Sequence, residues 1–207
     1  MRLPRFYPIL DTGVLARLGL TPERAAAAIL EGGARILQFR HKGFFSREVF
    51  AQASAVERLC RAAGALFVVN DRVDVAAMLD AAAHVGQEDL PPQEARSILG
   101  AGRVLGLSTH NRAQIEESNG QPVDYVAVGP VFATYTKDRP DPVVGLDQLA
   151  AWRGLTLRPL AAIGGITRHN AAAVLAAGAD SVAVISDALC EEKQLRGRIE
   201  EWIKIVG

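Results

Sequence analysis

The sequence predicts an α/β protein, a closed (β/α)8 TIM barrel that forms a single domain over residues 1–207. Short β-branched or apolar runs alternate with alanine-rich stretches of helical spacing, a pattern typical of a parallel sheet with helical crossovers. Eight such units occur, which favours a closed barrel, and 207 residues lie near the lower limit of about 200 for that fold. An open, doubly wound sheet is the structural alternative.

Each predicted strand is a short run of apolar residues, and the helices between the strands carry recognisable end signals. Thr21 and Pro22 suit the N-cap and first position of a helix. Gly32, Gly64 and Gly178 stand where glycine commonly ends a helix. The predicted strands cover residues 5–10, 34–41, 65–70, 83–86, 103–108, 124–130, 158–165 and 180–186, and residues 191–206 form the last helix.

The overall composition excludes several classes of protein. Lys and Arg total 23 and Asp and Glu total 23, so no global field attracts nucleic acid or an acidic membrane surface, and we expect neither partner. No segment approaches the roughly 20 apolar residues of a membrane span, and the N-terminus has no signal-peptide pattern. Cys60 and Cys190 are far apart and fit no metal spacing. We therefore expect a soluble cytoplasmic protein, and a homo-oligomer stays open.

Polar residues recur at spacings of two along the second predicted strand and just beyond it. Gln38, Arg40 and Lys42 share one face of an extended chain, whereas Leu37 and Phe39 face the helices. In this fold the active site forms at the carboxyl ends of the strands. Two cations held together there require an anion, because each is costly to desolvate. The alternative is a pair of basic residues on the rim of the barrel.

Two acids stand at the ends of the third and fourth predicted strands. Asp71 follows Asn70, and Asp89 follows the strand that contains His84. Because neighbouring strands lie about 4.8 Å apart, the two carboxylates are able to share a cation. Magnesium takes one or two protein carboxylates and completes its shell with phosphate and water. The alternative is that each acid only caps or begins the next helix.

The remaining strand ends add hydroxyl groups, one cation and a second anion site. Ser108 ends the fifth strand, and the loop after the sixth strand offers Thr134, Thr136 and Lys137, unless it is an ordinary polar loop. Gly164 and Gly165 end the seventh strand, and Ile185 and Ser186 end the eighth. Loops at these two positions often bind phosphate through backbone N–H groups, for which we select Gly165, Ile185 and Ser186. The alternative is a tight turn and a helix cap.

With these residues identified, the chain resembles the thiamine-phosphate synthase (thiamine-phosphate pyrophosphorylase) family along nearly its whole length. The similarity runs in order through "LQFRHK", "VVNDRVDVA", "HVGQEDLP", "LGLSTH", "DYVAVGPVFATYTK", "AIGGIT" and "GADSVAVIS". It departs from the family's frequent pattern at His41, Ala133 and Asp138. Several motifs that match together make the resemblance specific.

The resemblance implies a transferase that joins hydroxymethylpyrimidine diphosphate to thiazole phosphate, with magnesium as cofactor. Asp71 and Asp89 are expected to bind Mg²⁺. The pyrimidine diphosphate is expected to contact Gln38, Arg40, Lys42, Asn70, Ser108 and Lys137, and the thiazole phosphate Thr134, Thr136, Gly165, Ile185 and Ser186.

The expected chemistry needs no protein nucleophile, and the sequence contains no Ser-His-Asp or Cys-His constellation. Diphosphate leaves first, and Arg40, Lys42, Lys137 and Ser108 are the candidate catalytic groups. His84 is expected to be a hydrogen-bonded core residue rather than a base. Two alternatives remain: a thiazole tautomerase of the same fold, and a non-catalytic sensor of thiazole phosphate or thiamine phosphate.

Overall fold

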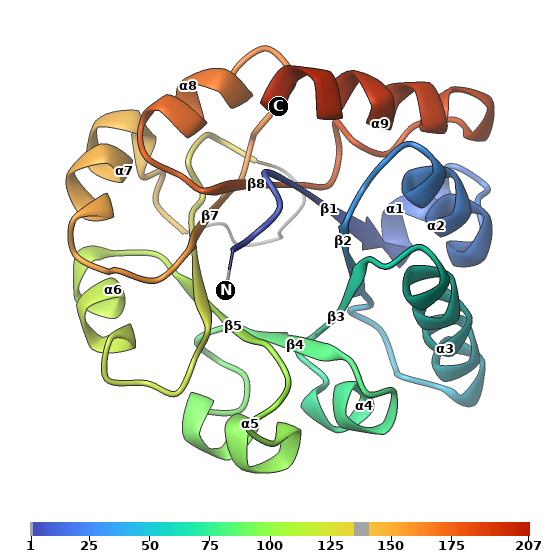
Figure 1. The fold of residues 1–207 in the computed structure, drawn as a ribbon, viewed down its shortest axis with the longest axis horizontal. Coiled ribbons are helices and arrows are strands. Elements are labelled where there is room, and N and C mark those ends of the chain that lie inside the picture. Colours follow the sequence, from blue (N-terminus) through green and yellow to red (C-terminus); the bar gives the residue numbers. More distant parts are fainter. Residues whose placement is uncertain (1, 135–140) are drawn as a thin grey trace.

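A computed structural model, which describes residues 2–134 and 141–207, confirms the closed barrel (Figure 1). The eight strands are parallel and are hydrogen-bonded in sequence order, and β8 closes on β1. Every strand is followed by helix, as the alternating pattern predicts. The open doubly wound sheet is therefore excluded.

The strands lie within or close to the predicted ranges. They are β1 Phe6–Asp11, β2 Ile36–Arg40, β3 Leu66–Asn70, β4 Ala82–Val85, β5 Leu105–Thr109, β6 Tyr125–Val128, β7 Leu160–Ile163 and β8 Ser181–Val184. The helices of the described residues are α1 Thr12–Arg17, α2 Pro22–Glu31, α3 Arg47–Ala62, α4 Val73–Met78, α5 Pro92–Leu99, α6 Arg112–Ser118, α7 Gly145–Arg153, α8 Ala171–Ala176 and α9 Glu192–Val206.

Local capping explains where several of these helices begin. The Thr21 hydroxyl accepts the backbone N–H of Arg24 at 3.4 Å, which confirms the predicted start of α2. The short α1 was not expected from the sequence. It begins because the Asp11 carboxylate accepts the N–H of Val14 at 2.9 Å. The side chain that ends β1 therefore also starts the next helix.

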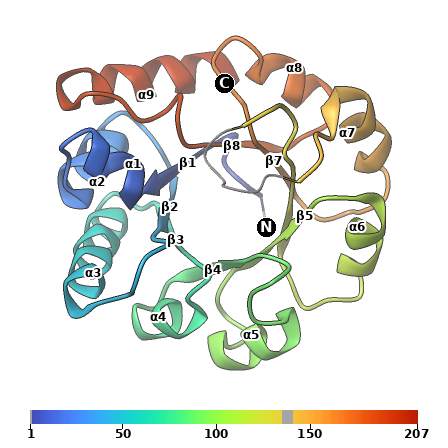
Figure 2. The same cartoon turned by 180° about the vertical axis from the view of Figure 1, so that it is seen from behind.

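Strand alternation divides the core into two layers. Tyr7, Ile36 and Val68 belong to a cluster inside the barrel, whereas Leu37 and Phe39 pack between the strands and the helices. The helices form a ring around the strands in both views (Figure 1, Figure 2). A residue two positions after a member of the inner cluster therefore also faces the barrel interior, but nearer the carboxyl ends of the strands. We call this end of the barrel the barrel mouth.

The amino end of the barrel is closed by the chain itself. Leu3 is 3% exposed and joins the inner cluster. The segment that leads into β1 accordingly lies over the middle of the barrel in both views (Figure 1, Figure 2). Across the described residues, no helix combines the length and apolar character needed to cross a membrane.

Candidate functional site

The clearest charged cluster at the mouth joins the ends of β2, β3 and β4. Lys42 Nζ lies 2.6 Å from Asp71 Oδ2, and Asp89 is near enough to Asp71 to influence its pKa. Burial raises the pKa of Asp71; Lys42 opposes the shift, and Asp89 adds to it. The structure thus brings the two acids together beside Lys42 at the ends of neighbouring strands.

The backbone around Asp71 argues against the simpler role of a helix cap. Asp71 has a φ of 62°, and the N-cap position of α4 is Arg72, which makes no side-chain capping bond. Arg72 instead pairs with Asp74 at 2.6 Å. The left-handed conformation turns the chain at the strand end, and the Asp71 carboxylate meets Lys42 rather than the helix.

Asp89 has a local role as well as a place at the mouth. Its Oδ2 accepts the backbone N–H of Gly86 at 2.7 Å, which closes the turn after β4. The N-cap of α5 is Pro91, so Asp89 does not cap that helix. Its neighbour Glu88 is exposed, whereas Asp89 is half-buried. Asp89 is therefore the acid of this segment that faces Asp71.

Arg40 is held by a residue that the sequence analysis missed. Its guanidinium forms an ion pair with the carboxylate of Asp11, directly opposite in the register of β1 and β2. The Arg40 side chain is 17% exposed and that of Asp11 is 9% exposed. Asp11 also caps α1, so one carboxylate fixes both the helix start and the guanidinium. The only sequence signal for this role was an acid at a strand end.

Asn70 carries a buried polar group that lacks a partner. Its side-chain Nδ2 has no hydrogen bond within the described part of the chain, although the residue is only 8% exposed. A buried N–H that finds no acceptor costs free energy. Asn70 pairs with His84 of β4 at the carboxyl end of β3, so the unpartnered N–H lies at this end of the barrel.

Below the mouth lies a buried hydrogen-bonded group that includes two predicted site residues. His84 contacts the Ser108 hydroxyl through Nε2 and the Tyr125 hydroxyl through Nδ1. Gln38 donates to the Tyr7 hydroxyl at 2.9 Å. Burial lowers the pKa of His84 to about 4, so the ring is neutral at neutral pH. The expectation that His84 is a bonded core residue agrees with these contacts.

The loops after β6, β7 and β8 place the remaining predicted residues. Thr134 is half-buried, Ile185 is half-buried and Ser186 is exposed. Thr136 and Lys137 lie outside the described residues. Gly165 has a φ of 62°, and a Cβ there would meet the Ala133 carbonyl oxygen at 2.5 Å. The close approach expected at this glycine is therefore made by the loop after β6.

The acids at the mouth fit a magnesium ion that is shared with a substrate. Within residues 2–134 and 141–207, no group of three or more His, Cys, Asp and Glu side chains is placed to hold a metal. Two carboxylates are nevertheless sufficient for Mg²⁺ when phosphate and water complete the shell. Asp71 and Asp89 approach each other closely enough to raise the pKa of Asp71, and a cation between them would relieve that repulsion.

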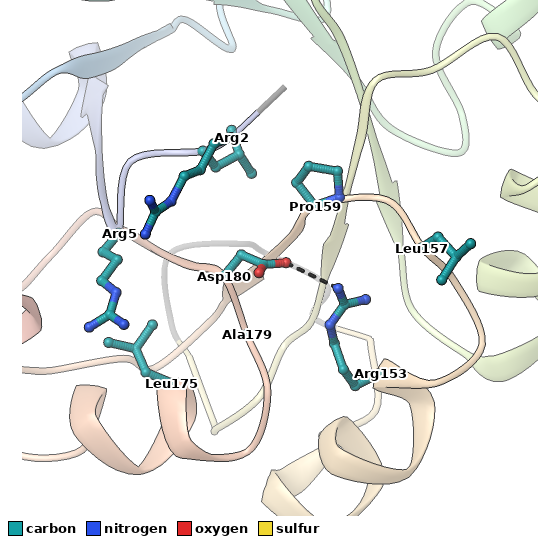
Figure 3. Close-up of a pocket in the computed structure, with 9 residues that line it drawn as sticks. Arg2, Arg5, Arg153, Leu157, Pro159, Leu175, Ala179 and Asp180 are labelled. Atoms are coloured by element: carbon teal, nitrogen blue, oxygen red, sulfur yellow. Dashed lines mark ion pairs between the residues drawn. The ribbon is translucent and has the colours of Figure 1, made fainter.

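A separate cavity of 340 Å³ opens at the opposite end of the barrel. Arg2, Arg5 and Arg153 surround it together with Asp180, and Arg153 pairs with Asp180 at 3.4 Å (Figure 3). Arg5 also donates to the Val206 carbonyl at 2.9 Å. Because catalytic sites in this fold form at the carboxyl ends of the strands, we place the candidate site at the mouth.

Comparison with known sequences gives a consistent result. The model of the family described as thiamine monophosphate synthase matches residues 6–188. The thiamine-phosphate synthase of Koribacter versatilis is 43% identical over 212 residues, which cover 100% of this chain and 97% of that protein. The thiamine-phosphate synthase of Laribacter hongkongensis is 45% identical, over 81% of this chain and 79% of that protein.

Solved structures extend the likeness to three dimensions. The thiamine phosphate pyrophosphorylase of Pyrococcus furiosus superposes with a TM-score of 0.85 at 36% identity, over 98% of this chain and 95% of that one. Tryptophan synthase of Mycobacterium tuberculosis, at 16% identity and a TM-score of 0.69, shares the fold alone.

Proposed function

Because the chain belongs to the thiamine monophosphate synthase family, we propose that it is a transferase that joins a pyrimidine diphosphate to a thiazole phosphate. The pyrimidine substrate is 4-amino-5-hydroxymethyl-2-methylpyrimidine diphosphate. The products are thiamine phosphate and diphosphate, with carbon dioxide when the thiazole is carboxylated. The observation that carries the proposal is the meeting of Lys42, Asp71 and Asp89 at the mouth.

The proposed diphosphate site uses residues from adjacent strand ends. Lys42 and Arg40 supply positive charge, and the unpartnered Nδ2 of Asn70 supplies a donor. Gln38 of β2 and Ser108 of β5 both face the barrel interior. They would complete the pyrimidine side of the site. Lys137 is proposed as a third cation from the loop after β6.

Asp71 and Asp89 would hold magnesium. When it is bound, the ion supplies charge that neutralises the diphosphate. Lys42 already pairs with Asp71, so in the free protein this lysine offsets part of the charge that the two carboxylates create. A diphosphate that arrives with its metal would give Lys42 an anionic partner of its own. This exchange supports placing both substrate charge and metal at one point of the mouth.

The proposed reaction breaks the bond between the pyrimidine methylene carbon and the diphosphate oxygen. The electron pair leaves with diphosphate, and Arg40, Lys42 and Lys137 stabilise the growing negative charge. The amino-substituted pyrimidine ring stabilises the resulting cation, which the thiazole nitrogen captures. No protein nucleophile takes part, and the buried, neutral His84 is bonded at both ring nitrogens.

The thiazole phosphate is proposed to occupy the side of the mouth near β7 and β8. Backbone N–H groups of Gly165, Ile185 and Ser186 would bind its phosphate, as such loops do in many barrels. Thr134 and Thr136 would contribute hydroxyl groups from the loop after β6. Two anion sites at one mouth suit a transfer between two phosphorylated molecules.

A product assay tests this function. The purified protein is incubated with both substrates and Mg²⁺, and thiamine phosphate and diphosphate are measured together. We expect equal amounts of both products, and no product when either substrate is left out. Conversion of the thiazole phosphate alone would favour the tautomerase, and binding without any conversion would favour the sensor.

A further inference from the structure

A continuous chain of hydrogen bonds crosses the barrel interior just below the mouth. Gln38 Nε2 donates to the Tyr7 hydroxyl at 2.9 Å, and that hydroxyl lies 3.0 Å from the Tyr125 hydroxyl. The Tyr125 hydroxyl lies 2.9 Å from His84 Nδ1, and His84 Nε2 lies 2.8 Å from Ser108 Oγ. The chain therefore links β2 to β5 through β1, β6 and β4.

The middle of this chain is tightly packed. Tyr7 and Tyr125 are at most 1% exposed, and the rings of His84 and Tyr125 stack with centroids 5.5 Å apart. Gly106 makes room for that pair: a Cβ at this position would lie 2.1 Å from Tyr125 Cζ and 2.5 Å from His84 Nδ1. Glycine in the interior of a strand otherwise weakens it, so its presence here has a packing reason.

Donor and acceptor chemistry gives the chain one direction. The Gln38 amide nitrogen only donates, so the Tyr7 hydroxyl accepts from it. The Tyr7 hydrogen then finds its acceptor at Tyr125, and the Tyr125 hydrogen finds its acceptor at His84 Nδ1. The opposite direction would leave the Tyr7 hydrogen without an acceptor among the contacts of the described residues. The ring hydrogen of His84 is therefore on Nε2, which donates to Ser108.

We propose that Tyr7, Tyr125 and His84 are positioning residues that hold Gln38 and Ser108 as one unit. Ser108 Oγ receives the His84 hydrogen, so its own hydroxyl hydrogen is directed to the mouth as a donor. Gln38 donates an N–H to Tyr7, so its amide oxygen is left to accept a hydrogen bond from the substrate. The inference rests on the proposed function only in taking that substrate to be the pyrimidine diphosphate.

The first test needs no substrate and is therefore independent of the proposed function. In ¹⁵N-histidine-labelled wild-type protein, long-range ¹H–¹⁵N spectra report which nitrogen of His84 carries the hydrogen. We expect the Nε2–H form. In Tyr125→Phe, His84 Nδ1 no longer accepts a hydrogen bond from the Tyr125 hydroxyl. We therefore expect signal from the Nδ1–H form to appear. In Tyr7→Phe the Tyr125 hydroxyl still reaches His84, so the wild-type form should persist. An Nδ1–H form in the wild type overturns the proposed direction.

The second test separates positioning from simple stability. Thr109→Val is the matched control. Thr109 lies next to Ser108 on β5, and its buried hydroxyl donates to the Ala127 carbonyl at 2.9 Å instead of joining the chain of hydrogen bonds. The loss of one oriented hydrogen bond corresponds to about a tenfold effect. We expect Tyr125→Phe and Tyr7→Phe to raise the KM for pyrimidine diphosphate, or lower kcat, by about that factor, with the thiazole phosphate KM unchanged.

Thermal unfolding of all three variants completes the design. If Tyr125→Phe and Thr109→Val lose equal stability but only the former changes the pyrimidine kinetics, the positioning role is supported. Equal kinetics in the two variants, or equal shifts in both substrate KM values, would overturn it. If Tyr125→Phe does not fold, Tyr7→Phe and the wild-type His84 spectrum still decide. A wild-type protein without synthase activity would refute the proposed function while leaving the spectroscopic result intact.

Discussion

Lys42 Nζ lies 2.6 Å from Asp71 Oδ2, so residues just beyond the neighbouring strands β2 and β3 form an ion pair at the barrel mouth. The lysine side chain is 55% exposed and that of Asp71 is 19% exposed. The pair is thus open to solvent on one side and packed against the site on the other. Its value to the protein is therefore expected to be functional more than structural.

Replacement of Lys42 separates the contribution of the ion pair to catalysis from its contribution to stability. We expect Lys42→Ala to change the free energy of unfolding by about 1 kcal/mol or less, because exposed ion pairs contribute little. We expect kcat/KM to fall by about a hundredfold, because the leaving diphosphate loses a cation. Thermal unfolding and initial rates check both, with Lys193→Ala as the control for an exposed lysine away from the mouth. Equal rates in the two variants would contradict the role of Lys42.

The two neighbouring acids Glu88 and Asp89 are expected to differ sharply. Asp89→Asn keeps an oxygen for the Gly86 N–H but removes the charge that faces Asp71. We expect it to lower activity at saturating pyrimidine diphosphate by about a hundredfold and to weaken the Mg²⁺ dependence. Glu88→Gln, which alters an exposed neighbour, should leave the rate nearly unchanged. The reverse pattern would mean that Glu88 is the metal ligand.

Asp71 is expected to show a conflict between stability and function. Its pKa is raised, chiefly by burial and also by Asp89, while Lys42 acts in the opposite direction. The folded protein thus holds this proton more tightly than the unfolded chain does. The contribution of Asp71 to stability is complete below the usual Asp pKa and is lost as pH rises through the raised value.

Asp71→Asn should therefore raise the Tm of the metal-free protein at neutral pH, and the gain should shrink in acid. Asn also tolerates the left-handed backbone that this position requires. The same variant should lose activity, because a neutral amide replaces a proposed metal ligand. Tm profiles against pH, measured in chelator, check the sign. A lower Tm than wild type at neutral pH would refute the assigned direction.

Asp11 is expected to matter through Arg40. Asp11→Asn keeps the oxygen that caps α1 but removes the charge that pairs with the guanidinium. We expect a loss of about 2 kcal/mol in the free energy of unfolding, typical of a hydrogen bond to a charged group. The KM for pyrimidine diphosphate should rise as Arg40 loses its orientation. Asp74→Asn, in an exposed pair with Arg72, is the control for urea unfolding and kinetics, and equal effects would oppose the role of Asp11.

Periodicity was sufficient to predict the fold and the inward direction of Gln38. The alternation of Gln38 with Leu37 and Phe39 correctly separated the barrel interior from the helix layer, because a strand has only two faces. The eight βα units were likewise found because each strand is apolar and several helices carry end signals. The short α1 was missed, since its start depends on one carboxylate rather than on a periodic pattern.

Most side-chain contacts between different strands could not be predicted from the sequence. Asp11 and Arg40 meet because β1 and β2 pair in one particular register, which no local pattern specifies. Tyr7 and Tyr125 stand in apolar strands and look like ordinary core residues, yet their hydroxyl groups meet 3.0 Å apart. Asp71 and Asp89 were paired correctly because both end neighbouring strands, so adjacency in sequence order was enough.

The central claim is that the mouth binds a diphosphate together with magnesium, and calorimetric titration tests it most directly. Pyrimidine diphosphate is titrated into wild-type protein and into Asp89→Asn, each with Mg²⁺ and with a chelator. We predict that Mg²⁺ tightens wild-type binding by at least about tenfold, about 1.4 kcal/mol, and has little effect on the variant. Equal affinity of the wild-type protein with Mg²⁺ and with chelator would contradict the account.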